Sequence, residues 1–333
     1  MKKRTGPERI FEMASFWEAR ALQTAVVLGV FDKLAGGPRT AAQLARSLKA
    51  KARSLELLLN ALVGMELLVK RGGAFSNNAE AARFLVSSSD DSVASNVAHG
   101  AYMWETWGRL DEAVRRNAPV RPERLRRRSP ESLRAFILAM HHGGRSKGAR
   151  IAKAVDLSGH THLADVGGGP GTYAIMFCKH TKGLRATVID HKEVLPIARE
   201  VVERSGLQER FEYVACDFVE QKRLPGTYDV AWVSNIIHSY DEKTNLSMLR
   251  KVVRTLEPGG LLLVQDFLLD ESRTQPGWAS LFALNMLVHA AGGRTYTERE
   301  VKAWFKRLGL RTVRRVALEL PNGAAVIVGT KPR

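Results

Sequence analysis

Residues 163–171, with the sequence LADVGGGPG, form an apolar segment that leads directly into a glycine cluster. A second apolar segment, TVID at residues 187–190, follows and ends on an acid. Glycine tolerates tight turns and lets bare backbone N–H groups approach a ligand. A carboxylate at the tip of the next strand can accept the hydroxyls of a ribose. Together the two segments predict neighbouring strands of a nucleoside-binding site.

The spacing of the glycines distinguishes between nucleoside ligands. A dinucleotide fingerprint would have its third glycine at Thr172, and its purpose is to seat a pyrophosphate at a helix N-terminus. The compressed cluster at residues 167–171 better suits a ligand without phosphates, such as S-adenosylmethionine. The alternative is that the glycines only permit tight packing of a strand against a helix, and motifs further along the chain weigh against it.

Composition indicates a globular protein of up to two domains. The chain has 333 residues, of which 45% are hydrophobic. No apolar run approaches the roughly 20 residues that span a bilayer, and Glu8, Glu12 and Glu18 interrupt the region where a signal peptide would be apolar. Cys178 and Cys216 form neither a CxxC motif nor a metal-binding spacing. We therefore expect a cytoplasmic protein without a membrane segment or a metal.

The chain is strongly basic, with 51 lysines and arginines, 34 aspartates and glutamates and a net charge of +17. Such an excess raises the question of nucleic-acid binding. The densest run of arginines, at residues 121–128, lies between Pro119 and Pro130 and is typical of a solvated linker. Nucleic acid is therefore the less favoured partner.

The first part of the chain has the element order of a winged helix. Residues 9–34 carry apolar side chains at helical spacing. Thr40 and Gln43 have the spacing of a capping box at the start of the next helix. A largely apolar helix at residues 54–68 and a hairpin at residues 69–75 follow.

A winged helix that reads DNA needs polar side chains on its second helix. Around residues 54–68 only Arg53 and Asn60 could reach a base, and most of this helix is apolar. We therefore predict a dimerisation domain at residues 1–100 that forms a homodimer. The second domain is predicted at residues 101–333, and its first part, residues 101–160, forms bridging helices.

The rest of the chain alternates between strands and helices, which predicts a doubly wound parallel sheet. The last two strands are separated only by residues 321–323, a connection that allows a hairpin but no crossover, so the final strand is antiparallel. We predict a seven-stranded Rossmann-like α/β sheet with strands at residues 163–166, 186–190, 211–216, 228–234, 260–267, 311–320 and 324–330.

Several ordered motifs resemble those of the S-adenosylmethionine-dependent O-methyltransferases of the plant caffeate and acetylserotonin type, which have bacterial relatives. The resemblance runs nearly end to end, and it lies in the winged-helix front, DVGGGPG at 165–171, Asp190, CDF at 216–218, NIIH at 235–238, LEPGG at 256–260 and LNML at 284–287 with Gly292 and Gly293. It implies the methyltransferase variant of the predicted sheet, dimerisation through the front domain, and S-adenosylmethionine as a cofactor that leaves as S-adenosylhomocysteine.

The resemblance also implies a set of cofactor-binding residues. Gly167, Gly168 and Gly169 would line the methionine and ribose side of the cofactor, and Asp190 would accept the ribose hydroxyls. Asp217 would bind the amino group of the adenine, and the ring of Phe218 would stack on it. Ser234 matches a cofactor-contacting position less directly. Asp217 could instead cap the following helix, and Phe218 could be a core residue.

His238 matches the general base of the family. An imidazole of ordinary pKa, about 6.5, is neutral enough at pH 7 to accept the proton of a phenol, whose pKa is about 10. Asp266 matches one of the two flanking acids and would orient the imidazole. Thr295 holds the position of the second acid. The sequence also departs from the usual pattern at Ala283 and at Ser239-Tyr240, the pair after His238. Fewer carboxylates imply an acceptor more acidic than a simple phenol, or a reaction that needs little base.

Candidates for the acceptor pocket are aromatic, methionine and polar residues on the bridging helices and near the LNML motif: Trp104, Trp107, Met140, His142, Asn285, Met286 and His289. Residues of these types at helical spacing are equally often core. Asn285 is the strongest candidate, because an amide can fix a hydroxyl or carbonyl in an apolar slot.

We predict from these observations an enzyme that transfers a methyl group to a hydroxyl of a small, aromatic metabolite without metal. C- or N-methylation by the same fold is the alternative. An RNA-directed methyltransferase and a non-enzymatic binder of the cofactor are the more distant ones.

Overall fold

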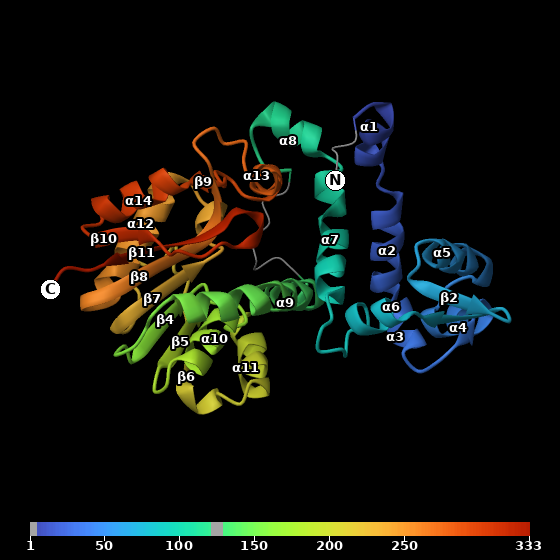
Figure 1. The fold of residues 1–333 in the computed structure, drawn as a ribbon, viewed down its shortest axis with the longest axis horizontal. Coiled ribbons are helices and arrows are strands. Elements are labelled where there is room, and N and C mark those ends of the chain that lie inside the picture. Colours follow the sequence, from blue (N-terminus) through green and yellow to red (C-terminus); the bar gives the residue numbers. More distant parts are fainter. Residues whose placement is uncertain (1–4, 121–128) are drawn as a thin grey trace. The chain divides into compact units, whose positions relative to one another are not determined.

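The computed structural model describes residues 5–120 and 129–333, and the chain divides into two compact units, Met1–Trp104 and Glu105–Arg333 (Figure 1). The predicted arginine-rich linker at residues 121–128 lies outside the described residues. Within the described ranges no helix is long and apolar enough to cross a membrane.

The first unit has the predicted order of helices followed by a hairpin. Its elements are α1 (Pro7–Ala14), α2 (Trp17–Leu28), α3 (Val30–Leu34), β1 (Arg39–Thr40), α4 (Ala41–Leu48), α5 (Ala52–Gly64), β2 (Leu68–Arg71), β3 (Ala74–Asn77) and α6 (Ala79–Phe84). The predicted capping box is confirmed, because the Thr40 side chain accepts from the Gln43 backbone N–H while the Gln43 side chain accepts from that of Thr40. The helix predicted to reach residue 68 ends at Gly64, since Glu66 adopts a left-handed backbone conformation with φ 59°.

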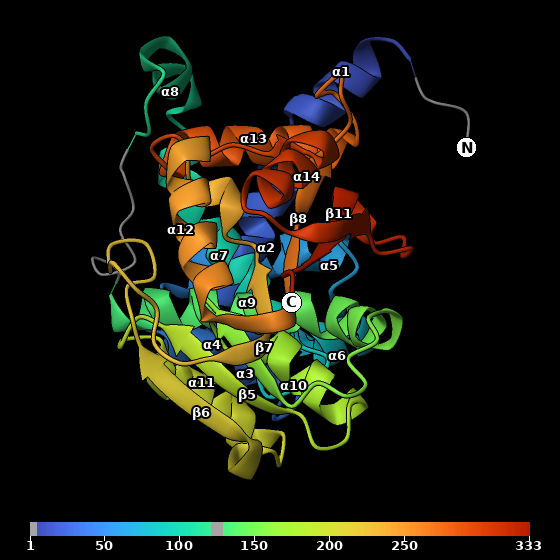
Figure 2. The same cartoon turned by 90° about the vertical axis from the view of Figure 1, so that its left-hand side faces the viewer.

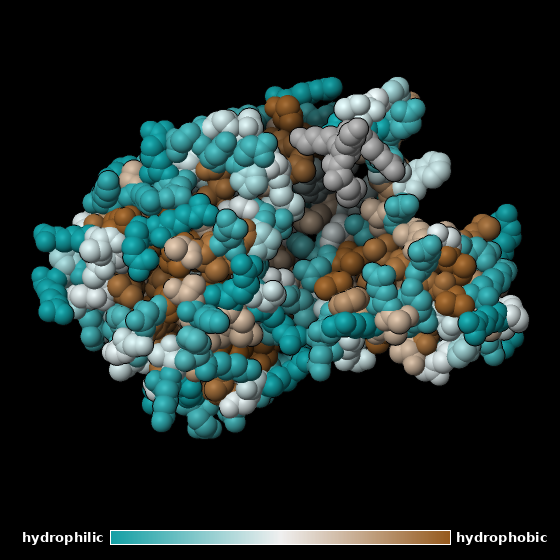
Figure 3. Space-filling model, in the orientation of Figure 1, coloured by the Kyte–Doolittle hydropathy of each residue, from teal (hydrophilic) through white to brown (hydrophobic). Residues whose placement is uncertain are grey.

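Helix α5 turns one stripe of leucines inward and leaves apolar side chains outside. Leu55, Leu59 and Leu62 are buried in the core of this unit, whereas Leu57 is 59% exposed. Helix α1 buries no residue, and Phe11 is 73% exposed. In Figure 3 apolar side chains gather on the surface of this unit. Contiguous exposed apolar surface marks an interaction site.

The second unit begins with the end of α7 (Ala94–Trp107), followed by α8 (Leu110–Arg116) and α9 (Pro130–Ala154). A seven-strand path then has the order β10-β11-β8-β7-β4-β5-β6. Its strands are β4 (His162–Val166), β5 (Arg185–Asp190), β6 (Phe211–Ala215), β7 (Tyr228–Ser234), β8 (Leu256–Leu269), β10 (Arg311–Arg315) and β11 (Ala324–Thr330). Pairing among β4 to β8 is parallel, and β11 pairs antiparallel with both β8 and β10. This confirms the predicted fold class.

The sheet differs from the prediction by more than one residue in three places. Strand β8, predicted at residues 260–267, extends over Leu256–Leu269. The strand predicted to extend to residue 320 ends at Arg315, because only the Val316 N–H continues the pairing with β11 before the chain leaves the sheet. A short strand, β9 (Tyr296–Thr297), pairs with the end of β8 and was not predicted.

Helices cover both faces of this sheet (Figures 1 and 2). One core cluster contains buried residues of α12 (Glu242–Thr255) and α14 (Glu298–Arg307), and the other those of α9, α10 (Thr172–His180) and α11 (Leu195–Arg204). Trp232 of β7 is fully buried and packs its ring 5.1 Å from that of Phe177 in α10. Helix α13 (Gly277–His289) follows β8. Because helices cover both faces of the sheet, the parallel strands are apolar along their whole length in the sequence.

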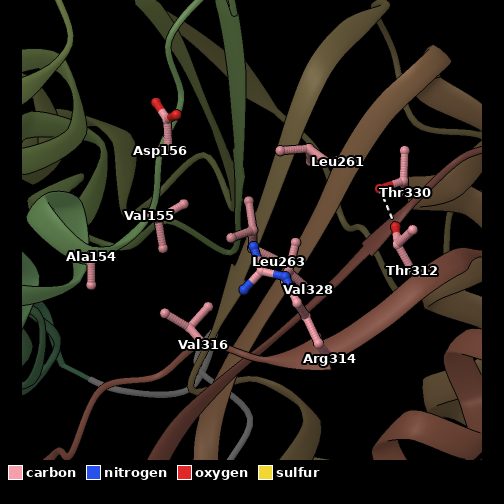
Figure 4. A pocket seen from close by; sticks show the side chains of 10 residues that line it. All are labelled: Ala154, Val155, Asp156, Leu261, Leu263, Thr312, Arg314, Val316, Val328 and Thr330. Carbon is pink, nitrogen blue, oxygen red and sulfur yellow. Dashed lines mark hydrogen bonds between the residues drawn. The ribbon is translucent and has the colours of Figure 1, made fainter.

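A cavity of about 100 Å³ lies where β10 and β11 meet the end of α9 (Figure 4). Leu263, Val316 and Val328 line it together with Arg314, and the Thr312 and Thr330 hydroxyls lie 2.7 Å apart at its edge. None of the predicted site residues contributes to this cavity.

Candidate functional site

The glycine cluster forms the turn between β4 and α10. Gly167, Gly169 and Gly171 have φ angles of 66°, 54° and 71°, which favour glycine. At Gly167 a Cβ would lie 2.6 Å from Ile236 Cδ1, so a larger residue would not fit without movement. At Gly169 the corresponding space is open. The turn therefore exposes backbone on one side and is closely packed on the other.

Asp190 at the end of β5 is held against this turn. Its carboxylate oxygens accept the backbone N–H groups of Gly169 at 2.8 Å and His191 at 2.7 Å. The side chain is 6% exposed, and burial raises the pKa of Asp190 while the two N–H groups oppose that shift. Each carboxylate oxygen retains acceptor capacity for a ribose hydroxyl. The predicted neighbourhood of acid and glycine cluster is thus present.

A second buried acid, Asp165, lies beneath the turn and was not predicted as a site residue. A Cβ on Gly168 would lie 2.7 Å from Asp165 Cγ, and Asp165 Oδ2 has no hydrogen-bond partner among the described residues. Burial and the neighbouring Asp190 raise the pKa of Asp165 to about 7. Two buried acids beside an open glycine turn suit a ligand that carries positive charge, which S-adenosylmethionine does at its sulfonium and ammonium groups. The residues present therefore fit this cofactor.

The predicted adenine-binding pair follows β6. Asp217 Oδ1 accepts the N–H groups of Val219 at 3.3 Å and Glu220 at 3.1 Å, so this acid caps the following turn as the alternative interpretation anticipated. Phe218 is 4% exposed, belongs to a core cluster and has its ring centroid 5.9 Å from that of His191. Both residues therefore contribute to local structure.

Ser234 ends β7 within a buried polar network. Its hydroxyl donates to Gln265 Oε1 at 2.7 Å and accepts from Asn235 Nδ2 at 3.0 Å. Asn235 has φ 55° and turns the chain out of the sheet. Asn235 Oδ1 and Gln265 Nε2 are buried and lack partners in the described part of the chain. Neither Asn235 nor Gln265 was among the predicted site residues, although Asn235 belongs to the NIIH motif.

The structure brings His238 and Asp266 into direct contact. His238 lies on a short 3-10 turn, Ile237–Ser239, and its Nδ1 is 2.7 Å from Asp266 Oδ1. Asp266 also accepts the backbone N–H groups of His238 at 3.3 Å and Phe267 at 2.8 Å. The two residues are 8% and 1% exposed. A carboxylate at Nδ1 fixes the proton there and leaves the lone pair on Nε2.

The backbone around His238 is held by groups that are themselves buried. Asn245, which is 0% exposed, donates from Nδ2 to the carbonyls of Ile237 at 2.8 Å and Tyr240 at 3.0 Å. The Arg294 N–H donates to the His238 carbonyl at 2.8 Å. These bonds tie the turn to α12 and to the segment after α13.

Aromatic side chains surround the imidazole. The Phe282 ring meets it edge to face with centroids 4.8 Å apart, and Phe267 lies 4.9 Å from Phe282. Trp278, which is 41% exposed, stacks on Phe282 at 5.1 Å. Thr295, at the position of the missing second acid, is 2% exposed. Asp266 is thus the only carboxylate that the described structure hydrogen-bonds to His238.

Three of the predicted acceptor-pocket residues meet between α7 and α13. The Trp107 indole N–H donates to Asn285 Oδ1 at 2.9 Å. His289 Nε2 lies 2.7 Å from Thr106 Oγ1, and its Nδ1 lies 2.9 Å from the Asn285 carbonyl. Asn285 therefore already uses its amide oxygen within the protein.

The structure does not join the other candidates to this group. Met286 is buried and Met140 is 38% exposed, while His142 lies beside His141 on α9. Trp104 packs in the first unit, 5.3 Å from Phe16. His141, which was not singled out for a site, is 2.9 Å from Thr172 Oγ1 at the start of α10, and burial lowers its pKa to about 4.

No group of three or more histidine, cysteine or acidic residues within the described ranges could hold a metal ion.

Comparison with known families identifies matches to both parts of the chain. Residues 120–311 match a family model described as the O-methyltransferase domain, and residues 12–88 match the O-methyltransferase dimerisation domain.

Individual proteins match over almost the whole chain. The sequence is 32% identical to a 3-hydroxy-5-methyl-1-naphthoate 3-O-methyltransferase of Streptomyces sahachiroi, across 98% of this chain and 95% of that protein. It is 30% identical to a mitomycin biosynthesis 6-O-methyltransferase of Streptomyces lavendulae, across 93% and 89%. The crystal structure of human N-acetylserotonin methyltransferase in complex with S-adenosylmethionine superposes with a TM-score of 0.85, 27% identity and coverage of 100% of both chains.

Proposed function

Because this chain belongs to the S-adenosylmethionine-dependent O-methyltransferases, we propose that it methylates a hydroxyl group of a small aromatic acceptor with His238 as general base. The observation that carries this proposal is the 2.7 Å contact between His238 Nδ1 and Asp266 Oδ1. With Nδ1 engaged by the carboxylate, Nε2 is the imidazole nitrogen that can accept a proton.

The proposed roles follow from this geometry. S-adenosylmethionine, when bound, supplies an electrophilic methyl group on a sulfonium. His238 accepts at Nε2 the proton that the acceptor hydroxyl loses, and Asp266 stabilises the imidazolium that forms. Help from a positioned base of this kind is typically worth about 10² to 10⁴ in rate.

The residues proposed to hold the cofactor are those around the glycine turn. Gly167, Gly168 and Gly169 would contact it through backbone, and Asp190 would accept the ribose hydroxyls. The positive charge of the bound ligand would favour the ionised form of Asp165 beside the turn. Asp217, Phe218 and Ser234 remain candidates for the adenine side and for the end of β7.

Relatives support an aromatic acceptor. The Streptomyces sahachiroi relative is named for a hydroxylated naphthoate, a fused aromatic ring that carries both a hydroxyl and a carboxylate. The rings of Phe267, Trp278 and Phe282 beside His238 suit such a flat molecule. With Thr295 in place of a second acid, a hydroxyl more acidic than that of a simple phenol would place less demand on the base.

We further propose that the protein forms a homodimer through residues 1–100, acts in the cytoplasm, and binds its acceptor with residues 101–333. The match of residues 12–88 to the dimerisation domain and the exposed apolar side chains of α1 and α5 support the homodimer. Trp107, Met140, His142, Asn285, Met286 and His289 remain candidates for the acceptor pocket.

Two measurements test the proposal. Calorimetry with S-adenosylhomocysteine should detect binding to the purified protein. A panel of hydroxylated aromatic compounds incubated with labelled methyl donor should yield a methyl ether. Absence of cofactor binding would overturn the proposal, and label found on carbon or nitrogen would establish the alternative transfer.

A further inference from the structure

Lys147 on α9 is a half-buried cation that forms no ion pair with the residues that the structure describes. Its Nζ lies 5.2 Å from the ring centroid of Phe267, and it forms no hydrogen bond with any of those residues. Burial lowers the pKa of Lys147, and the charge of Asp266 offsets this shift in part. A cation removed from water without a partner carries a desolvation cost that a bound anion would relieve.

Lys251 shows how this chain accommodates a buried lysine that has only a structural role. It is 8% exposed, and its Nζ donates to the carbonyls of Val219 at 2.6 Å and Gln221 at 2.9 Å. Lys147 has no such acceptors. Its ammonium group therefore has its hydrogen-bonding capacity available to a ligand.

Lys147 also borders the region of the proposed base. Phe267, whose ring it faces, directly follows Asp266 at the end of β8 and lies 4.9 Å from Phe282, whose edge meets His238. Lys147 is seven residues from Met140, which places both on one face of α9 about 10 Å apart along the helix axis. The lysine, the aromatic rings and the imidazole therefore belong to one end of the sheet.

We propose that Lys147 binds a carboxylate on the aromatic acceptor, which makes the preferred acceptor a hydroxylated aromatic acid. This inference rests on the proposed function and specifies its substrate class. The rings would hold the flat aromatic body, the ammonium group would fix its acidic end, and the hydroxyl to be methylated would lie at the end near His238.

The methionine carboxylate of the cofactor is a second source of the same chemistry. The glycine turn follows β4, whereas Phe267 lies on β8, two strands away in the sheet order and thus about 10 Å across the strands. Helix α9 itself, however, packs against the start of α10, where His141 Nδ1 lies 2.9 Å from Thr172 Oγ1. We assign the anion to the acceptor because of the aromatic ring of Phe267 that Lys147 faces, and the experiment below distinguishes the two sources.

The test compares the unmodified protein with Lys147→Met, which keeps the length of the side chain and removes its charge. Lys153→Met, an exposed lysine of the same helix, is the matched control. The probes are a hydroxynaphthoate, the corresponding hydroxynaphthamide and the unsubstituted naphthol. For each, calorimetry measures Kd in the presence of S-adenosylhomocysteine, and methyl transfer measures kcat/KM.

We expect Lys147→Met to lower affinity and kcat/KM for the hydroxynaphthoate about 10- to 100-fold, the effect of one charge-assisted hydrogen bond. The values for the amide and the naphthol should change less than threefold, and Lys153→Met should change none. An equal loss for all three probes, or an unchanged preference for the acid, would overturn the assignment. A loss of S-adenosylhomocysteine affinity would reassign the lysine to the cofactor. Failure of the hydroxynaphthoate to bind or accept methyl would also overturn the assignment, whereas a protein that binds no S-adenosylhomocysteine would refute the proposed function.

Discussion

Asp266 holds His238 at two points, accepting from its Nδ1 at 2.7 Å and from its backbone N–H at 3.3 Å. The acid therefore fixes both the tautomer of the imidazole and the position of the residue that carries it. His238→Ala should lower kcat by about 10² to 10⁴. Asp266→Asn should lower it less, because the amide can keep the contact without the charge. Both variants should bind S-adenosylhomocysteine as the unmodified protein does, and a large loss of that affinity in calorimetry would contradict the assigned roles.

The buried Asp165 should make stability depend on pH. Its pKa is raised from 3.8 to about 7, so the folded state holds a proton that the unfolded state releases. The contribution of Asp165 to the free energy of unfolding should therefore be highest below pH 3.8 and should fall as the pH rises to about 7. This fall is at most roughly 4 kcal/mol. Asp165→Asn should flatten this part of the profile. Denaturant unfolding between pH 4 and 8 measures it, and parallel profiles for both proteins would show that Asp165 has no such effect.

Asn245 should matter for both stability and turnover. Asn245→Asp keeps the shape but replaces the group that donates to the carbonyls of Ile237 and Tyr240 with an acceptor. We expect a loss of about 2 to 4 kcal/mol of unfolding free energy, from two hydrogen bonds and a buried charge. In the fraction that remains folded, kcat should fall more than KM rises, because the imidazole loses its support. A fall in stability with normal kcat would limit Asn245 to a structural role.

The glycine turn offers a matched pair of substitutions. Gly167→Ala would place a Cβ 2.6 Å from Ile236 Cδ1, whereas the space at Gly169 is open. Both positions have a left-handed backbone, so alanine causes backbone strain at each of them. Only Gly167→Ala adds a steric clash. Gly167→Ala should lower the free energy of unfolding, measured with denaturant, by about 1 to 3 kcal/mol more than Gly169→Ala. Equal losses would show that backbone strain, and not the packing against Ile236, controls the turn.

The succession of strands along the chain and the glycine turn after the first of them could be predicted because they depend on local patterns. Apolar segments separated by helices define a wound sheet, and the glycine cluster marks the end of β4. The contact between His238 and Asp266 followed from the resemblance, since they are 28 residues apart and no local pattern connects them.

Other features depend on tertiary packing and left little trace in the sequence. The two residues of β9 are too few to show a period, and their strand exists because they pair with the end of β8. Asp165 was hidden by its apolar neighbours, although an acid within such a strand is itself a signal of a site. The Trp107–Asn285 hydrogen bond and the unpaired Lys147 require knowledge of which helices meet.

The fixation of His238 by Asp266, Asn245 and the Arg294 backbone has an evolutionary consequence. None of these anchors lies on α9 or α13, the helices that carry most candidate acceptor contacts. The proposed roles would therefore place the anchoring of the base and the choice of acceptor in separate parts of the chain. Exchanging α9 and α13 between relatives is consequently a route by which this scaffold can gain new acceptors while retaining its proton-transfer apparatus.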